Sequence, residues 1–197
     1  MLKLGITGGI GAGKTVVASF LKAMGVPVYI ADDEAKKLTC SSPVIKSELI
    51  QSFGEELFAN DTLNKALLAS LIFKNKENLN LVNSIIHPEV LSDFNNWVKK
   101  HNDKTLVALE SAILFESRFD KNLDLILAVT APLEERIERI RKRNRLTREE
   151  ILERITNQLP ENEKCGRSDF VVYNNNNKAI IPQIEYVLEK ISISAKQ

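Results

Sequence analysis

The segment from Gly8 to Thr15 has the residue types and the spacing to bind phosphate. It reads GGIGAGKT and matches the pattern G-x-x-x-x-G-K-[ST]. Glycine lets a chain curl so tightly that several backbone N–H groups can point toward an anion. Lys14 can neutralise the β- and γ-phosphates of ATP, and the hydroxyl of Thr15 can bind Mg²⁺. The predicted ATP-binding residues are Gly8, Gly9, Ile10, Gly11, Ala12, Gly13, Lys14, Thr15 and Val16, and Thr15 is the predicted metal ligand.

A carboxylate follows the next apolar segment. Asp32 comes directly after residues 26–30, which we expect to form a strand, and parallel sheets bind ligands at the carboxyl ends of their strands. Asp32 could accept the proton of an acceptor hydroxyl or orient that hydroxyl. Alternatively, Asp32 caps the short helix expected at 34–39. Both roles could hold, with Asp33 as the cap.

Residues 139–148 form a cationic segment with six cations and no acid. The cations are Arg139, Arg141, Lys142, Arg143, Arg145 and Arg148. The segment could be an ordinary solvated helix face, because Glu135 can pair with Arg139, and Glu138 with Lys142. Arg141, Arg143 and Arg145, however, have no acid four residues before them on the expected helix.

Arginine is suited to a lid over a phosphoryl group. Phosphoryl transfer spreads negative charge over the transferred group, and the planar guanidinium matches that charge. A kinase must also exclude water, because otherwise it hydrolyses ATP. Arg136, Arg139 and Arg143 share one face of the expected helix. We therefore interpret residues 136–158 as a lid in which Arg143 and Arg139 are catalytic.

Two polar residues follow other expected strands. Glu110 follows the apolar residues 106–109, where it could hold a Mg²⁺-bound water or cap the next helix, and we favour the cap. Asn174 follows the strand expected at 169–173, where it could border the adenine site.

The elements that must position these residues indicate an α/β fold. Leu2–Thr7 is a buried strand, residues 14–24 form a helix that ends at Gly25, and residues 26–30 form a second strand. Further strands are expected at 105–109, 123–130 and 169–173, and helices at 132–144, 147–159 and 179–191. Thr147 and Glu150 have the spacing of a capping box. Strands separated by helices predict a parallel sheet.

The segment between the second and third strands reads as mostly helical. Helices are expected at 34–39, 44–53, 62–73 and 76–101, with turns at Pro43, at Gly54 and at Asn60–Asp61. This is more helix than a crossover between parallel strands requires. We interpret it as an insertion that covers the sheet edge and helps to bind the second substrate.

The composition is that of a globular protein. The chain has 197 residues, of which 44% are hydrophobic and 27% charged, and its formal net charge of +1 argues against nucleic-acid binding. Cys40 and Cys165 lack metal or redox spacing and read as reduced thiols. The first strand begins at Leu2, which leaves no room for a signal peptide, and no apolar run could span a membrane. We expect a cytoplasmic monomer or weak homo-oligomer without membrane or nucleic-acid partners.

Other nucleotide-binding classes fit less well. A GTPase would need D-x-x-G and N-K-x-D, yet no aspartate lies three residues before a glycine, and Asn75-Lys76-Glu77-Asn78 lacks the closing aspartate. A helicase or motor ATPase needs a longer chain. The residues therefore favour an ATP-dependent kinase that acts on a small molecule.

The chain resembles the dephospho-CoA kinase family over nearly its whole length. The matching segments are Gly5–Thr15, Ile30-Ala31-Asp32, Ile72-Phe73, His87-Pro88, Leu114-Phe115-Glu116, Arg154-Ile155 with Gln158, and Ser168–Val172 with Asn174. Departures from the family pattern are Ile30 in place of an aspartate, Lys36 in place of an arginine, and Ser111-Ala112-Ile113-Leu114 in place of a Pro-Leu-Leu run.

The resemblance implies transfer of the ATP γ-phosphate to the ribose 3′-hydroxyl of dephospho-CoA. It implies a three-layer P-loop kinase fold: a core of residues 1–32, 105–135 and 159–197 with a five-stranded parallel sheet, a helical acceptor-binding region at 33–104, and a lid at 136–158. The implied acceptor-binding residues are Asp32, His87, Leu114, Phe115 and Glu116. For His87, a purely structural role is the alternative to acceptor binding. Another P-loop kinase of small molecules, such as a nucleoside monophosphate kinase, is the alternative function.

Overall fold

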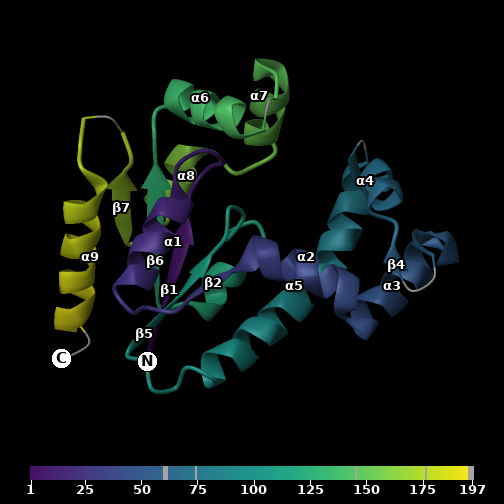
Figure 1. Ribbon diagram of the computed structural model, residues 1–197, viewed down its shortest axis with the longest axis horizontal. Coiled ribbons are helices and arrows are strands. Elements are labelled where there is room, and N and C mark those ends of the chain that lie inside the picture. Colours follow the sequence, from purple (N-terminus) through teal and green to yellow (C-terminus); the bar gives the residue numbers. More distant parts are fainter. Residues whose placement is uncertain (60–61, 74, 145, 176, 195–197) are drawn as a thin grey trace. The chain divides into compact units, whose positions relative to one another are not determined.

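The computed structural model describes residues 1–59, 62–73, 75–144, 146–175 and 177–194. The chain divides into two units (Figure 1): unit 1 comprises Met1–Ile30 and His101–Gln197, and unit 2 comprises Ala31–Lys100. Unit 2 is thus inserted into the sequence of unit 1 between its second and third strands. The turn predicted at Asn60–Asp61 lies outside the described residues.

Unit 1 is built on a five-stranded sheet. Its strands are β1 (Leu2–Thr7), β2 (Val28–Ile30), β5 (Leu106–Glu110), β6 (Leu125–Thr130) and β7 (Phe170–Tyr173), in the spatial order β2-β5-β1-β6-β7. All neighbouring strands are parallel. Parallel strands are covered on both faces, and their sequences therefore read as nearly continuous apolar runs. The predicted α/β fold with a five-stranded parallel sheet is confirmed.

Helices and a looped segment cover the two faces of this sheet. The helices of the described part of unit 1 are α1 (Lys14–Ala23), α6 (Leu133–Asn144), α7 (Arg148–Thr156), α8 (Glu161–Gly166) and α9 (Ile180–Ser194). In the main core, Leu4 of β1 packs with Val17 of α1 and Ile184 of α9. On the opposite face, a Cβ at Gly5 would lie 2.8 Å from Leu114, so glycine admits the segment that follows β5. These are the three predicted layers.

Helices α6 and α7 form a small core of their own. Ile137, Ile140 and Ile151 are buried in it. The predicted capping box starts α7: Thr147 Oγ1 accepts from the Glu150 N–H at 3.2 Å, and Glu150 Oε2 accepts from the Thr147 N–H at 2.7 Å. The helix pair is therefore defined both by apolar packing and by a polar start signal at the N-terminus of α7.

Unit 2 is mostly helical. Its elements are α2 (Ala31–Ser41), α3 (Pro43–Phe53), β3 (Phe58–Ala59), β4 (Thr62–Leu63), α4 (Lys65–Phe73) and α5 (Lys76–Lys99), with a 3₁₀ turn at Glu55–Leu57. Ile45, Leu49 and Val82 are buried in its core. Ser42 and Asn75 cap α3 and α5 by accepting backbone N–H bonds. None of the described helices has the length and apolar character needed to span a bilayer.

Two expectations about local structure are wrong, and one helix was missed. Helix α2 begins at Ala31, directly after β2, so Asp33 lies inside the helix and pairs with Lys36 at 3.0 Å instead of capping. Thr62 and Leu63 pair with β3 rather than starting a helix. Helix α8 was not expected. Strands β3 and β4 have 2 residues each and α8 has 6, and periodicity carries little information over so few residues.

Candidate active site

The phosphate loop connects β1 to α1. Gly8 and Gly13 have positive φ angles of 144° and 100°, which L side chains rarely adopt. A Cβ at Gly8 would lie 2.1 Å from the carbonyl oxygen of Val129, and one at Gly13 would lie 1.9 Å from Nδ2 of Asn174. Both glycines are therefore required by backbone conformation and by close neighbours.

Lys14 is buried at the first position of α1. Its Nζ donates to the carbonyl oxygen of Gly8 at 3.1 Å and to that of Gly9 at 3.5 Å, and it lies 3.9 Å from Oε1 of Glu110. Glu110 is also buried. The attraction between the two opposite charges offsets part of the free energy that it costs to remove them from water. The ammonium group therefore lies against the loop backbone, where it can reach a bound phosphate.

Glu110 does not cap a helix, contrary to the sequence interpretation. It is the last residue of β5, and turns follow at 112–118. Its register partner on β1 is Ile6, close to the start of the phosphate loop. The carboxylate thus comes to the loop through strand pairing.

Thr15 and Val16 lie in the first turn of α1 and are exposed. The positive end of the helix dipole favours anions at this position. The hydroxyl of Thr15 and the carboxylate of Glu110 are oxygen donors, which Mg²⁺ prefers. No cluster of three or more histidine, cysteine or acidic residues suited to a metal occurs in the described part of the chain. This donor set fits a Mg²⁺ ion that takes most of its ligands from nucleotide phosphates and water.

Ile10 contacts α6, α7 and the residues just after α7 through its N–H, its carbonyl oxygen and its side chain. Its N–H donates to Oε1 of Gln158 at 2.9 Å, and its carbonyl oxygen accepts from Nε of Arg136 at 3.0 Å. Its side chain packs against the small core around Ile137 and Ile140. The phosphate loop is thus joined at this residue to a segment about 130 positions away in sequence.

Arg136 is buried, with 4% of its surface exposed, and is paired with Glu161 at 2.7 Å. Glu161 also accepts from the hydroxyl of Thr130 at 2.6 Å and from the N–H of Ala131 at 3.3 Å. The sequence pattern puts Arg136 on a helix face but reveals neither its partner nor its burial. Glu161 lies 25 residues away in sequence, so no local pattern could reveal the pair.

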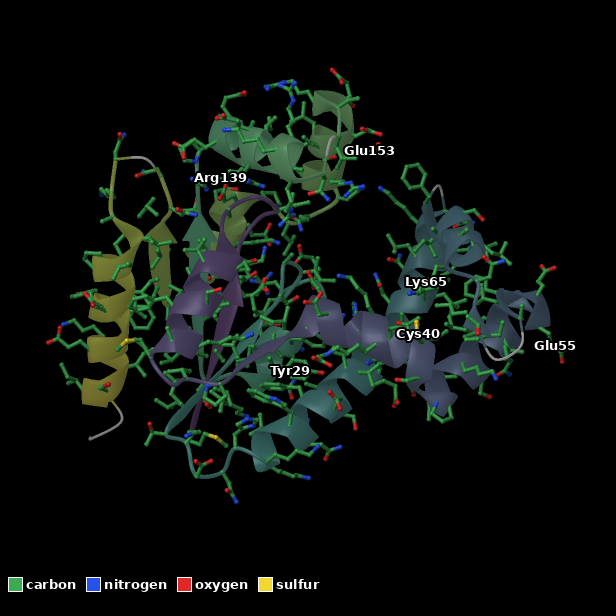
Figure 2. All side chains as sticks on the ribbon, in the orientation of Figure 1. Tyr29, Cys40, Glu55, Lys65, Arg139 and Glu153 are labelled. Atoms are coloured by element: carbon green, nitrogen blue, oxygen red, sulfur yellow. The ribbon has the colours of Figure 1, made fainter. Side chains whose placement is uncertain are left out.

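Arg139 and Asn174 also converge on the loop. Arg139 projects from α6 (Figure 2), donates to Gly11 and Ala12 carbonyl oxygens at 3.4 and 3.5 Å, and pairs with Glu135 at 2.9 Å as predicted. A second guanidinium nitrogen donates to the Asn174 carbonyl oxygen at 2.9 Å. Asn174 Nδ2 donates to the carbonyl oxygen of Ala12 at 2.8 Å. Arg139 is therefore a loop contact as well as half of a helix pair.

The outer part of the cationic segment is exposed. Arg143 donates from Nε to its neighbour Asn144 at 2.8 Å rather than to the phosphate loop. Lys142 pairs with Glu138 at 2.7 Å, as predicted, and Arg148 pairs with Glu134 at 2.6 Å. Arg145 lies outside the described residues. The structure brings Arg139 to the phosphate loop and leaves Arg143 at the surface.

The residues at 114–116 are held within unit 1. Leu114 is fully buried against Gly5, so its side chain belongs to the core. Phe115 is buried beneath the guanidinium of Arg167, which lies 4.1 Å from the ring centre. Glu116 pairs with Lys164 at 2.9 Å and accepts from the N–H of Leu159 at 2.9 Å.

Asp32 and His87 belong to unit 2, whereas the phosphate loop belongs to unit 1. Asp32 is the second residue of α2, in a first turn where the helix dipole favours acids. His87 lies within α5 and is half-buried, and burial lowers the pKa of its imidazole from the ordinary value.

The chain is similar to known kinases along most of its length. A family profile described as dephospho-CoA kinase matches residues 2–179. The dephospho-CoA kinase of Bacteroides fragilis (strain YCH46) is 46% identical over 183 residues, which cover 93% of this chain and 89% of the relative. That of Porphyromonas gingivalis is 39% identical over 193 residues, covering 97% and 95%.

Solved structures agree on the fold. A protein of Thermus thermophilus has a TM-score of 0.79 at 33% identity, with 98% of this chain and 97% of that chain covered. A dephospho-CoA kinase from Campylobacter jejuni has a TM-score of 0.71 at 22% identity, with 98% of each chain covered. The fold also extends to a shikimate kinase from Acinetobacter baumannii, with a TM-score of 0.56 at 15% identity and coverage of 98% and 94%.

Proposed function

This chain belongs to the dephospho-CoA kinase family, and we propose that it transfers the γ-phosphoryl group of ATP to the ribose 3′-hydroxyl of dephospho-CoA, the last step of coenzyme A synthesis. The observation that carries this proposal is the family match over residues 2–179, which spans the phosphate loop and its contacts. The shikimate kinases share the fold at low identity and therefore give no reason to prefer another acceptor.

In the proposed mechanism, the phosphate loop binds ATP. The backbone N–H groups of residues 8–16 that are not bonded within the protein, as that of Ile10 is to Gln158, face the phosphates, and Lys14 neutralises charge on the β- and γ-phosphates. Thr15, and Glu110 through a water molecule, would hold Mg²⁺, which would supply further charge neutralisation. Asn174 supports the loop through Ala12, at the end of β7 where the adenine is expected.

Asp32 is proposed to act on the acceptor. Its carboxylate can take the proton of the 3′-hydroxyl or orient that hydroxyl toward the γ-phosphorus. Asp32 lies two residues beyond Ile30, the last residue of β2, whose carboxyl end is at the edge of the sheet where the phosphate loop begins. The helical region 33–104, including His87, is proposed to hold the CoA part of the acceptor. Leu114, Phe115 and Glu116 of unit 1 are proposed as further acceptor-binding residues.

The lid at 136–158 is proposed to shield the reaction from water. Arg139 is the first candidate for the charge that develops on the transferred group, because it already donates to the loop backbone. Arg143 is the second candidate, since it lies one helical turn further along the same face.

Three coarser properties complete the proposal. A net charge of +1 offers no broad basic surface, so we do not expect nucleic-acid binding. We propose a cytoplasmic enzyme, because its substrates ATP and dephospho-CoA are cytoplasmic metabolites. We propose a monomer or a weak homo-oligomer.

The decisive experiment is a substrate screen. Purified protein with ATP and Mg²⁺ is given dephospho-CoA, adenosine, AMP, CMP or shikimate, and products are read by mass and by ³¹P NMR coupling to the ribose protons. We expect one added phosphate, at the 3′ position, with dephospho-CoA alone. Turnover of AMP or CMP instead would replace the proposal with nucleoside monophosphate kinase activity.

A further inference from the structure

The two helices α6 and α7 and the linker that follows them hold the phosphate loop at one residue, Ile10. Gln158 lies in that linker, just beyond the end of α7 at Thr156, and accepts from the Ile10 N–H. Arg136 lies in the first turn of α6 and donates to the Ile10 carbonyl oxygen. Both polar groups of a single loop residue are therefore held by side chains from one distant segment.

A trans peptide unit is planar, with its C=O and N–H pointing in opposite directions. Because Gln158 holds the Ile10 N–H on one side, the Gly9 carbonyl must point to the other. This agrees with the observation that Gly9 accepts from Ala12 at 3.1 Å and from Lys14 at 3.5 Å. The next peptide unit joins the Ile10 carbonyl to the Gly11 N–H. Because Arg136 of α6 binds the Ile10 carbonyl oxygen, the Gly11 N–H points in the opposite direction, away from α6.

Arg136 is itself fixed. Its guanidinium is almost fully buried and divides its donors between Ile10 and Glu161, whose carboxylate is held in turn by Thr130 and Ala131 at the end of β6. A planar guanidinium with two fixed partners has little freedom to rotate. The orientation of the loop peptide is therefore coupled to the rigid sheet.

We propose that Gln158 and Arg136 are positioning residues for the proposed kinase reaction: they orient the peptide planes on either side of Ile10 so that the Gly11 N–H faces the nucleotide phosphates. They touch neither ATP nor the acceptor. They act on the affinity of the loop for a polyphosphate, and this inference rests on the proposed function only in that ATP is the donor.

The first test uses inorganic tripolyphosphate, a probe that binds phosphate sites and carries no base or acceptor. Gln158→Leu keeps the size of the side chain and removes the acceptor. Loss of one neutral hydrogen bond should weaken tripolyphosphate and ADP binding about fivefold and raise KM for ATP by a similar factor. KM for dephospho-CoA should not change, because the acceptor does not contact Ile10 in this scheme.

Conservative variants of Gln158 and Arg136 distinguish a role in positioning the loop from a role in packing. Gln158→Glu keeps an oxygen at the same place but adds a negative charge, so at about 0.5 M salt, which screens that charge, it should bind tripolyphosphate more tightly than Gln158→Leu does. Arg136→Lys keeps a charge for Glu161, but a single ammonium group cannot replace the guanidinium fork that spans Glu161 and Ile10, so it should weaken binding about as much as Gln158→Leu.

Asn75→Ala is the matched control, because Asn75 is another amide side chain that accepts backbone N–H bonds, at the start of α5. It should lower the melting temperature without weakening tripolyphosphate binding. Wild-type affinity in Gln158→Leu, or no rescue by Gln158→Glu, overturns the inference. If wild-type protein fails to phosphorylate dephospho-CoA, the proposed function fails, while the tripolyphosphate comparison still decides the role of Gln158.

Discussion

The candidate functional residues of units 1 and 2 are distributed differently along the sequence. In unit 1, the phosphate loop is surrounded by side chains that are distant in sequence: Gln158 is 148 positions from Ile10, and Asn174 is 162 positions from Ala12. In unit 2, Asp32 and His87 lie on helices within one continuous stretch of chain, residues 31–100. The phosphate loop and its contacts therefore depend on the whole α/β fold, whereas the candidate residues of unit 2 are single side chains of a local helical unit.

This difference suggests a functional division. Substitutions around the phosphate loop should alter nucleotide binding and chemistry, and substitutions in unit 2 should alter acceptor phosphorylation alone. Each of the following variants tests whether the division holds.

Lys14→Ala should have the largest effect. Lys14 is the only cation in the motif itself, and removing a positioned charge from a phosphate site should lower kcat by about 10²–10³-fold. ADP binding should weaken as well. Single-turnover rates and ADP titration measure both effects, and thermal unfolding shows whether the buried Glu110 has been left without support. Wild-type turnover in a folded variant would contradict the assignment of the phosphate loop.

Asp32→Asn should come next. Asparagine keeps the size of the side chain but cannot take a proton, so kcat should fall by about 10²-fold if Asp32 is a base, and less if it only orients the hydroxyl. ADP binding should not change. Asp33→Asn is the matched control, because Asp33 is exposed and forms an ion pair with Lys36, which is exposed as well. A decrease below about threefold would exclude a catalytic role for Asp32.

Arg139 and Arg143 provide a comparison within one helix. Arg139→Met removes charge-assisted bonds to the loop and should lower kcat about tenfold, whereas Arg143→Met should cost about twofold, because an exposed guanidinium is screened by water. The measurements are kcat and the ratio of ATP hydrolysed to acceptor phosphorylated. A larger effect at Arg143 would show that the outer part of α6 reaches the substrate during catalysis.

The smallest expected effect is on stability at low pH. Burial lowers the pKa of His87 below the ordinary value of 6.5. Just below that pH, the unfolded chain therefore binds a proton at His87 that the folded chain does not bind. The free energy of unfolding should consequently fall as the pH drops below about 6.5. His87→Gln should remove this contribution, which we expect to change the melting temperature by about 1–3 °C. His101→Gln is the control. An unchanged pH profile in His87→Gln would contradict the prediction.

The sequence predicted the features that depend on neighbouring residues. The phosphate motif, the strand Leu2–Thr7 and the capping box at Thr147 each follow from a short pattern with one physical cause, and all three are present. The pair of Glu135 with Arg139 follows from helix geometry in the same way.

Other features could not be read from neighbouring residues. The sequence suggested helix caps for Asp33 and Glu110, but Asp33 lies inside α2 and Glu110 pairs with Lys14 beside the phosphate loop. The local sequence around a carboxylate at a predicted strand end does not show whether that carboxylate caps the next helix or pairs with a cation. The outcome depends on whether the chain continues directly into a helix, as at Ala31, or into turns, as after Glu110.

The sequence by itself determined that this protein binds a nucleotide phosphate, because the glycine pattern and Lys14 constrain the backbone within eight consecutive residues. Only the tertiary structure decided which side chains hold that loop. Arg136, Gln158 and Asn174 become partners of loop carbonyl and N–H groups because parallel strand pairing brings the ends of β1, β6 and β7 together. Hydrogen bonds between groups so far apart leave no periodic signal, since they depend on strand order and not on spacing along the chain.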